Sequence, residues 1–230
     1  MGFYRKILDL KSNIYEFLTK PKTVRFSISS AGITFFSAII IGVIVAQFDP
    51  DGYNIVDNYI SDMGSFKHTP MPYFLDYGAM ITSILMIPTI YYMEKRLAPS
   101  PLNSNSKTFP RMRYRLSGLG FFFMFMGAFG FFMIGLFSED RTTSLGLHFF
   151  FSHVVFAGMV LCSFFYGLLI LFYDTPIPKL IGLYMTIFPL TAGLLMIYYF
   201  NPLFEWIMLF SLLIWMIPVF LIFLKDLKEF

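Results

Sequence analysis

The sequence LGLHFFFSHVVFAGMVLCSFFYGLLILF occupies residues 145–172 and contains no Asp, Glu, Lys or Arg. A bilayer core about 30 Å thick is crossed by roughly 20 apolar residues in a helix, because each residue adds about 1.5 Å. Residues 145–172 therefore predict a transmembrane helix that is long enough to tilt or to extend beyond the hydrocarbon.

Five further apolar runs of similar length occur in the 230-residue chain, near Ile28–Gln47, Tyr73–Tyr92, Leu116–Phe137, Leu180–Phe200 and Trp206–Leu224. Hydrophobic residues make up 57% of the sequence and charged residues only 13%, and the mean hydropathy is +0.68. Soluble domains average about 45–50% apolar and about 25% charged residues. Composition excludes a water-soluble globular protein, and we predict an all-α fold, a single bundle of six transmembrane helices.

The positive charges predict the orientation of these spans, because Lys and Arg concentrate in short cytoplasmic loops. Only Lys67 and Arg141 of the 17 Lys and Arg residues fall on one side of the predicted membrane. The other fifteen share the opposite side: Arg5, Lys6, Lys11, Lys20, Lys22, Arg25, Lys95, Arg96, Lys107, Arg111, Arg113, Arg115, Lys179, Lys225 and Lys228. We predict a multi-pass protein of the cell membrane with both termini in the cytoplasm.

Residues 1–22 have a different character from the transmembrane domain expected over residues 23–230. Apolar residues recur there at helical spacing: Phe3, Tyr4, Ile7, Leu8, Ile14, Tyr15 and Leu18. This pattern predicts an amphipathic helix on the cytoplasmic leaflet, with its cations toward anionic headgroups. A helix that binds a partner protein is the alternative. The Pro-, Asn- and Ser-rich segment 98–110 indicates a flexible cytoplasmic connector.

Side chains capable of acid–base or metal chemistry gather at the predicted outer end of the bundle. They are Asp49, Asp51, Asp57, Asp62, Asp76, Glu139, Asp140, Glu205, His68, His148 and His153. The single cysteine, Cys162, lies in an apolar run and is expected to be a small core residue. Nothing in the sequence indicates nucleic-acid binding, a particular cofactor or an oligomeric state.

Three clusters stand out within this set. Residues 57–64 read DNYISDMG and place Ser61 beside Asp62, ahead of a glycine that permits a tight turn. Residues 138–141 read SEDR, and residues 147–153 read LHFFFSH. Ionisable groups inside a membrane are costly and usually functional.

His148 and His153 are five residues apart, so they point about 140° away from each other on a straight helix. Two histidines that share a metal on one helix favour i, i+4 spacing, and the sequence therefore does not favour a two-histidine metal site. We expect His68 to be a solvated loop residue. His148 and His153 are either functional or structural, hydrogen-bonding at the interface or to another helix.

Glu139 and Asp140 are expected to form a solvated turn that caps the fourth span. The prolines Pro88, Pro189 and Pro218 could kink the second, fifth and sixth spans.

The stretch NYISDMG, residues 58–64, resembles a signature placed before the second span in a superfamily of six-span membrane proteins. That superfamily includes the damage-regulated autophagy modulators, the proteins that assist GPI-anchor lipid remodelling, and a prokaryotic family known as domain of unknown function 998. The Tyr-Ile-Ser-Asp-x-Gly pattern and a histidine near the outer start of span four carry the resemblance: Tyr59, Ile60, Ser61, Asp62, Gly64 and His148, with His153 as the alternative.

The resemblance covers Thr23 to Leu224. The eukaryotic members tend to continue with a Pro-Glu pair after the glycine, whereas Lys67 and His68 are followed here by TPMP without a Glu. The chain is therefore most similar to the prokaryotic branch. The resemblance implies the six-span architecture, a site at these residues and an association with lipids.

Two hypotheses of different class follow. In the first, the protein handles membrane lipids as a hydrolase or transferase: a histidine acts as general base, Asp62 holds its tautomer, and Ser61 is the nucleophile or an orienting donor. Asp62 and His148 should then lie within about 3–4 Å, directly or through one water. A metal held by Asp62, a histidine and Glu139 or Asp140 is a variant.

In the second hypothesis the protein is a non-catalytic sensor, scaffold or assembly factor. Asp62 would then bind backbone amides near Gly64 to fix the outer loop, and the histidines would brace helices. A small-molecule transporter is a third hypothesis, for which the sequence shows no internal repeat.

Overall fold

The computed structural model of the chain describes residues 2–98 and 110–227, which are 80% helical and contain no strand. The elements in order are α1 (Gly2–Leu18), α2 (Pro21–Ala46), the 3₁₀ helix η1 (Ile60–Gly64), α3 (Tyr73–Leu85), α4 (Ile87–Leu97), α5 (Pro110–Leu136), the 3₁₀ helix η3 (Glu139–Arg141), α6 (Leu147–Phe172), α7 (Lys179–Tyr199) and α8 (Pro202–Asp226). The expected connector over 98–110 lies almost entirely outside the described residues.

Five helices, α2, α5, α6, α7 and α8, are each long and apolar enough to cross a membrane. Together α3 and α4 supply a sixth span, which is bent by 40° at Met86. Pro88, in the first turn of α4, has no N–H with which to continue the hydrogen-bond ladder of α3, and this explains the break. Pro189 and Pro218 lie within the unbroken helices α7 and α8. The all-α prediction of six spans is confirmed.

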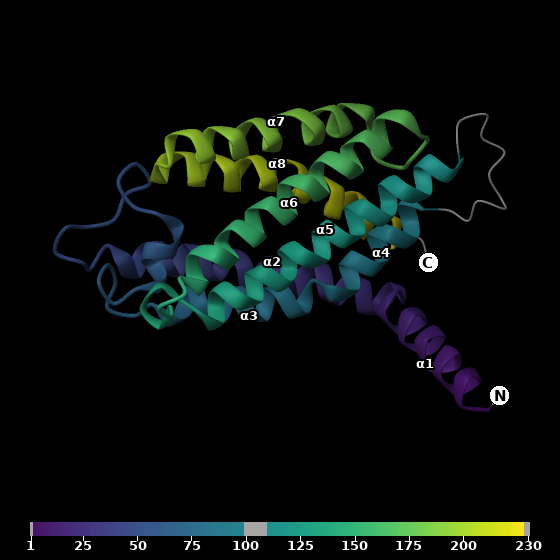
Figure 1. Ribbon diagram of the computed structural model, residues 1–230, viewed down its shortest axis with the longest axis horizontal. Helices are drawn as coiled ribbons and strands as arrows, with labels where there is room; N and C mark the ends of the chain where they lie inside the picture. Colours follow the sequence, from purple (N-terminus) through teal and green to yellow (C-terminus); the bar gives the residue numbers. More distant parts are fainter. Residues whose placement is uncertain (1, 99–109, 228–230) are drawn as a thin grey trace.

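Both described ends of the chain lie at the same end of the bundle, and α1 projects away from it there (Figure 1). The Tyr15 hydroxyl on α1 donates a hydrogen bond to the Glu94 carboxylate on α4 at 3.1 Å. α1 ends at Leu18 and α2 begins at Pro21, slightly before the boundary predicted from the sequence.

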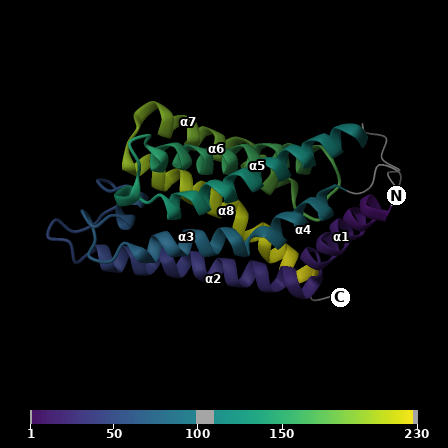
Figure 2. The same ribbon diagram turned by 60° about the horizontal axis from the view of Figure 1, so that its bottom comes forward.

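The helices pack mainly as sequence neighbours, α2 with α3, α5 with α6, α6 with α7 and α7 with α8, while α3 also packs on α5 (Figure 2). Two glycines let α5 and α6 approach each other closely. A Cβ atom on Gly158 would lie 2.6 Å from the backbone nitrogen of Gly127, so only glycine allows this contact. Small residues of this kind let membrane helices pack closely in the absence of a hydrophobic driving force.

The larger core lies between α4, α5, α6 and α8, where Ile90, Tyr166, Trp215 and Phe223 are almost fully buried. A smaller core of Ala46, Tyr53, Met63 and Trp206 lies beneath the long loop that joins α2 to α3. The loop over residues 47–72 is therefore packed onto the bundle.

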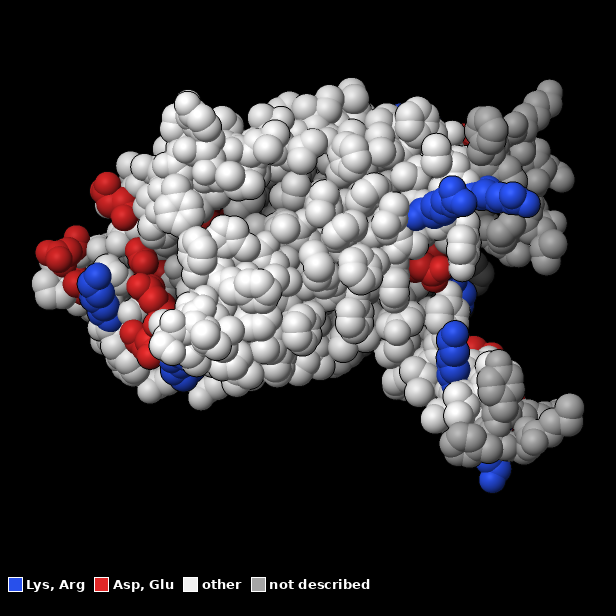
Figure 3. All heavy atoms as spheres, viewed as in Figure 1, with Lys and Arg blue, Asp and Glu red and all other residues white. Residues whose placement is uncertain are grey.

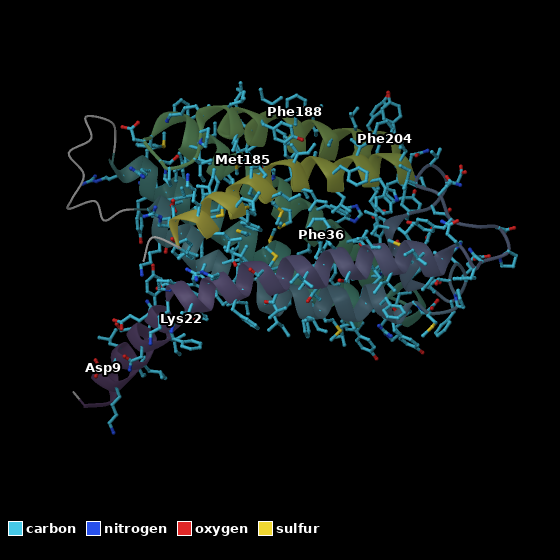
Figure 4. The ribbon with its side chains drawn as sticks, turned by 180° about the vertical axis from the view of Figure 1, so that it is seen from behind. Asp9, Lys22, Phe36, Met185, Phe188 and Phe204 are labelled. Atoms are coloured by element: carbon cyan, nitrogen blue, oxygen red, sulfur yellow. The ribbon has the colours of Figure 1, made fainter. Side chains whose placement is uncertain are left out.

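The outer surface of the bundle is suited to lipid. Met185 of α7 is fully buried, whereas Phe188, one turn later, is 56% exposed on the outer face (Figure 4). Figure 3 shows acidic side chains gathered over the loops at one end, Lys and Arg mostly toward the other, and an almost uncharged surface between them. Exposed aromatic and aliphatic side chains on helices of this length fit a multi-pass membrane protein.

Candidate functional site

The segment NYISDMG folds into η1 and the turn before it, and Asp62 organises that turn. Oδ2 of Asp62 accepts a hydrogen bond from the Tyr59 backbone N–H at 2.8 Å and a longer one from the Asn58 side-chain amide at 3.4 Å. Asp62 is only 7% exposed. One carboxylate oxygen is thus committed to holding the turn, which is the contact expected if Asp62 fixes the outer loop.

Contacts to the other end of the chain hold η1 against the bundle. Glu205, in the first turn of α8, is buried and accepts a hydrogen bond from the Ile60 N–H at 2.6 Å. The Trp206 indole N–H donates to the Asn58 carbonyl at 3.2 Å, and the Tyr59 hydroxyl donates to the Phe200 carbonyl at 3.0 Å.

Gly64 ends η1 where the loop passes α3. A Cβ atom at this position would lie 2.9 Å from Oδ1 of Asp76, so a larger residue would displace that carboxylate. Asp76 is buried, and its Oδ2 accepts a hydrogen bond from the Arg141 guanidinium at 2.7 Å. The glycine of the signature is needed for this close approach.

η3 lies beside η1 and positions its two carboxylates differently. Asp140 accepts hydrogen bonds from the Ser65 hydroxyl at 2.8 Å and the Phe66 N–H at 2.6 Å, so it joins the two loops. Glu139 is half-buried, and one of its oxygens, Oε2, is buried without a hydrogen-bond partner.

The prediction that Glu139 and Asp140 cap span four is wrong, although Asp140 is exposed as expected for a solvated turn. The residue before α6 is Gly146, in the left-handed conformation with φ of 64°, and no side chain caps the helix. Asp140, considered as a metal ligand from the sequence, has both oxygens committed to the neighbouring loop.

His68 belongs to the site, contrary to the expectation of a solvated loop histidine. Its Nε2 lies 4.0 Å from Oδ1 of Asp62, the carboxylate oxygen that does not hold the turn. One ligand atom from each of Asp62, His68 and Glu139 lies within 4.8 Å of the others. No local pattern in the sequence indicates this grouping, because it depends on how the 47–72 loop folds onto η3.

His148 contributes from the start of α6 but does not form the expected direct bond to Asp62. Its Nδ1 lies 2.8 Å from the Phe137 carbonyl, and its Nε2 is buried without a partner. His153 is exposed, with Nδ1 2.8 Å from the Phe149 carbonyl and its ring against the Phe149 ring. His148 is therefore the more buried of the two histidines, and it is near enough to Glu139 to interact with its charge.

The charge balance of the site is negative. Glu139 and Glu205 lie close enough to Asp62 to interact with its charge, and in the described ranges no Lys or Arg forms an ion pair with any of the three. Burial raises the pKa of Glu139, and the Asp62 charge raises it further, whereas His148 and His68 oppose the shift.

Two cavities lined mainly by apolar side chains open from this region. The bundle cavity has a volume of about 170 Å³ and extends between α2, α3, α5, α6 and α8, past Phe35, Phe131 and Met216. The α6–α7 cavity has a volume of about 520 Å³ and extends along those two helices past Ala157 and Leu190. The residues that line both cavities are Ser61, His148, Ser152, Phe156 and Glu205.

The structure therefore brings the predicted residues Ser61, Asp62, His148 and His153 to the lining of one cavity, the α6–α7 cavity. Glu205 also lines this cavity, and His68 lies beside Asp62. The sequence assigned no role to either residue. Glu205 carried a usable signal, because a carboxylate in the first turn of an apolar span is costly unless it has a role.

Comparison with protein-family models, with curated proteins and with solved structures found no match to this chain. The resemblance of residues 58–64 to the six-span superfamily remains a prediction.

Proposed function

We propose that this protein binds a membrane lipid, with the headgroup at the polar residues near Asp62 and the acyl chains in the two cavities. The observation that carries the proposal is the convergence of both cavities on the same polar residues, Ser61, His148, Ser152 and Glu205. A cavity that joins a polar end to long apolar walls matches the two ends of an amphipathic molecule.

The depth of the polar residues supports this arrangement. His148 is the second residue of α6, and Ser152 follows one turn later, so both lie within about 8 Å of the helix start. The polar residues therefore lie near the level at which headgroups meet hydrocarbon, while the cavities continue toward the bilayer centre. The end that carries them is the one we predict to face outward.

Chemistry on the bound lipid is a natural extension of this arrangement. If Nδ1 of His148 donates its proton to the Phe137 carbonyl, Nε2 keeps a free lone pair and can accept a proton. Ser61 lines the same two cavities as His148 and is the candidate nucleophile. The class of reaction is then hydrolysis or transfer at a lipid ester, with Asp62 fixing the turn that carries Ser61.

A non-catalytic sensor or scaffold is the second candidate, and the bond from Tyr59 N–H to Asp62 favours it. In this case Asp62 and Glu205 serve to fix the outer loop, and a bound lipid is a structural or regulatory ligand.

Native mass spectrometry of the purified protein tests lipid binding. We expect the wild type to retain a lipid, and Ala157→Trp, which places an indole in the α6–α7 cavity, to lose it. Gly118→Trp is the matched control, because Gly118 is exposed, lines neither cavity, and has open space within 4 Å of where a Cβ atom would lie. Equal retention by both variants would refute the cavity assignment.

Lipid profiles of cells lacking the protein separate the two candidates. Under the catalytic candidate, wild type restores the profile and Ser61→Ala does not, although the variant folds normally. Restoration by Ser61→Ala would remove the catalytic candidate and leave lipid binding.

A further inference from the structure

We propose that Asp62, His68, Glu139 and His148 form a binding site for one divalent transition-metal ion, and that Zn²⁺ suits these donors best. Metal binding here would not require a bound lipid, because Asp62, His68 and Glu139 are brought together by η1, the loop that follows it and η3. His148, at the start of α6, is near enough to Glu139 to interact with its charge, and it would supply Nε2 as the fourth ligand in place of the general-base role.

The geometry of the first three residues is close to that of a metal site. Their ligand atoms lie within 4.8 Å of one another, and Nε2 of His68 is 4.0 Å from Oδ1 of Asp62. Two ligands of a tetrahedral zinc ion stand about 3.3 Å apart, given zinc–ligand distances of about 2.0–2.2 Å. Bringing ligand atoms that are up to 4.8 Å apart to this spacing requires a contraction of up to about 1.5 Å. The His68 side chain is 26% exposed on a loop and can supply most of this movement.

His148 has the hydrogen bonding of a metal ligand without a metal. Metal-binding histidines almost always donate one ring N–H to a carbonyl or carboxylate, which fixes the ring and turns the other nitrogen toward the ion. Nδ1 of His148 is 2.8 Å from the Phe137 carbonyl, and Nε2 is buried with no partner.

Asp62 and Glu139 show the same division between a held atom and a free one. Oδ2 of Asp62 is held by the Tyr59 N–H, which leaves Oδ1 to face His68. Oε2 of Glu139 is buried without a partner. Two unpartnered buried atoms in one cluster, one on Glu139 and one on His148, are unusual because buried polar atoms are nearly always satisfied.

Charge gives an independent reason for a cation. Asp62, Glu139 and nearby Glu205 carry up to three negative charges, and no described Lys or Arg pairs with them. A divalent ion would offset most of this repulsion. Two imidazoles with two carboxylates favour zinc-like ions over Ca²⁺ or Mg²⁺, which prefer oxygen ligands throughout.

The test uses full-length, tag-free protein in detergent micelles, stripped with a chelator and then titrated with Zn²⁺. We expect saturable binding of one zinc per chain and a rise in the thermal unfolding temperature. His68→Asn and His148→Asn should each weaken zinc binding by more than about 100-fold, because even residues that only support a ligand cost about 10–100-fold.

Matched controls use the same substitutions outside the cluster. His153→Asn removes an exposed histidine from α6, and Asp57→Asn removes an exposed loop carboxylate. Both should bind zinc as the wild type does. Replacing zinc with Co²⁺ should give the intense visible absorption of a four-coordinate ion, and His68→Asn should abolish it.

Zinc binding that is undiminished in His68→Asn, or that is lost equally in His153→Asn, overturns the proposal. The absence of saturable zinc binding to folded wild-type protein also overturns it. His68 lies on the partly exposed loop, so His68→Asn is informative even if His148→Asn fails to fold.

Discussion

Arg141 and Asp76 form an ion pair, and removing Arg141 should lower the free energy of unfolding far more than neutralising Asp76. The Asp76 side chain is 4% exposed and that of Arg141 is 42% exposed, with 2.7 Å between them. Arg141 also donates to the carbonyls of Gly135 at 2.7 Å and Leu136 at 3.2 Å. If Asp76 is removed, the guanidinium keeps these two partners and water; if Arg141 is removed, the carboxylate stays buried without its cation.

The expected free energies of unfolding follow from this asymmetry. Breaking a buried ion pair by removing one partner costs about 3–5 kcal/mol. The half-exposed setting of Arg141 places Arg141→Met near the lower limit, at about 3 kcal/mol. Asp76→Asn keeps an acceptor for the guanidinium and should cost about 0.5–1.5 kcal/mol.

The double variant should resemble Asp76→Asn alone, since the buried charge is gone, giving a coupling energy of about 3 kcal/mol, the full cost of Arg141→Met. Unfolding by SDS titration in mixed micelles measures all four proteins. Equal costs for the single variants, or costs that add in the double variant, would refute this reasoning. Hydrogen exchange should also quicken around η3 in Arg141→Met, because Arg141 anchors the segment that carries Glu139.

Three further perturbations test other parts of the structure. Gly158→Val should lower the free energy of unfolding by about 3 kcal/mol, because the added side chain overpacks against α5. Gly118→Val, in open space, should change it by no more than about 0.5 kcal/mol. Similar unfolding of the two variants by SDS would contradict the close α5–α6 contact. Tyr15→Phe removes a hydrogen bond to Glu94 and should weaken the docking of α1 on α4 by about 0.5–1.5 kcal/mol. Trypsin should then cleave faster within α1. An unchanged cleavage rate would argue against docking. In chelator, the native state keeps the Glu139 proton to a higher pH than the unfolded chain does, because the pKa of this carboxyl group is raised. The free energy of unfolding should therefore fall as pH rises from 4.5 through the raised pKa, and Glu139→Gln should flatten that fall. Identical pH profiles would show that the carboxyl group is not buried as described.

The spans could be predicted from the sequence because each one contains its own evidence, an apolar run of sufficient length. The run over residues 145–172 became α6, the most buried of the five single-helix spans. The break in the second span was signalled by Pro88, although its position at Met86 and its angle depend on packing against α2 and α5.

The candidate site was only partly predictable, because its residues come from four separate segments. Asp62 and His148 could be named from a short motif and from the cost of a charged group in a membrane. His68 could not, since nothing local distinguishes a histidine in a polar loop that folds back over the bundle from one in water. The inward position of Glu139 also depends on contacts made by its neighbours, Asp140 with Ser65 and Arg141 with Asp76.

The most direct test of the central claim is photo-crosslinking with a diacyl phospholipid that carries a photoreactive group midway along one acyl chain. The protein is reconstituted in vesicles, and the labelled residues are mapped by mass spectrometry. Occupation of the α6–α7 cavity predicts labelling concentrated over residues 156–161 and 190–197, suppressed by Ala157→Trp and unaffected by Gly118→Trp. Labelling spread evenly over outward-facing residues such as Ile33 and Ile187, with no effect of Ala157→Trp, would contradict lipid binding in this cavity.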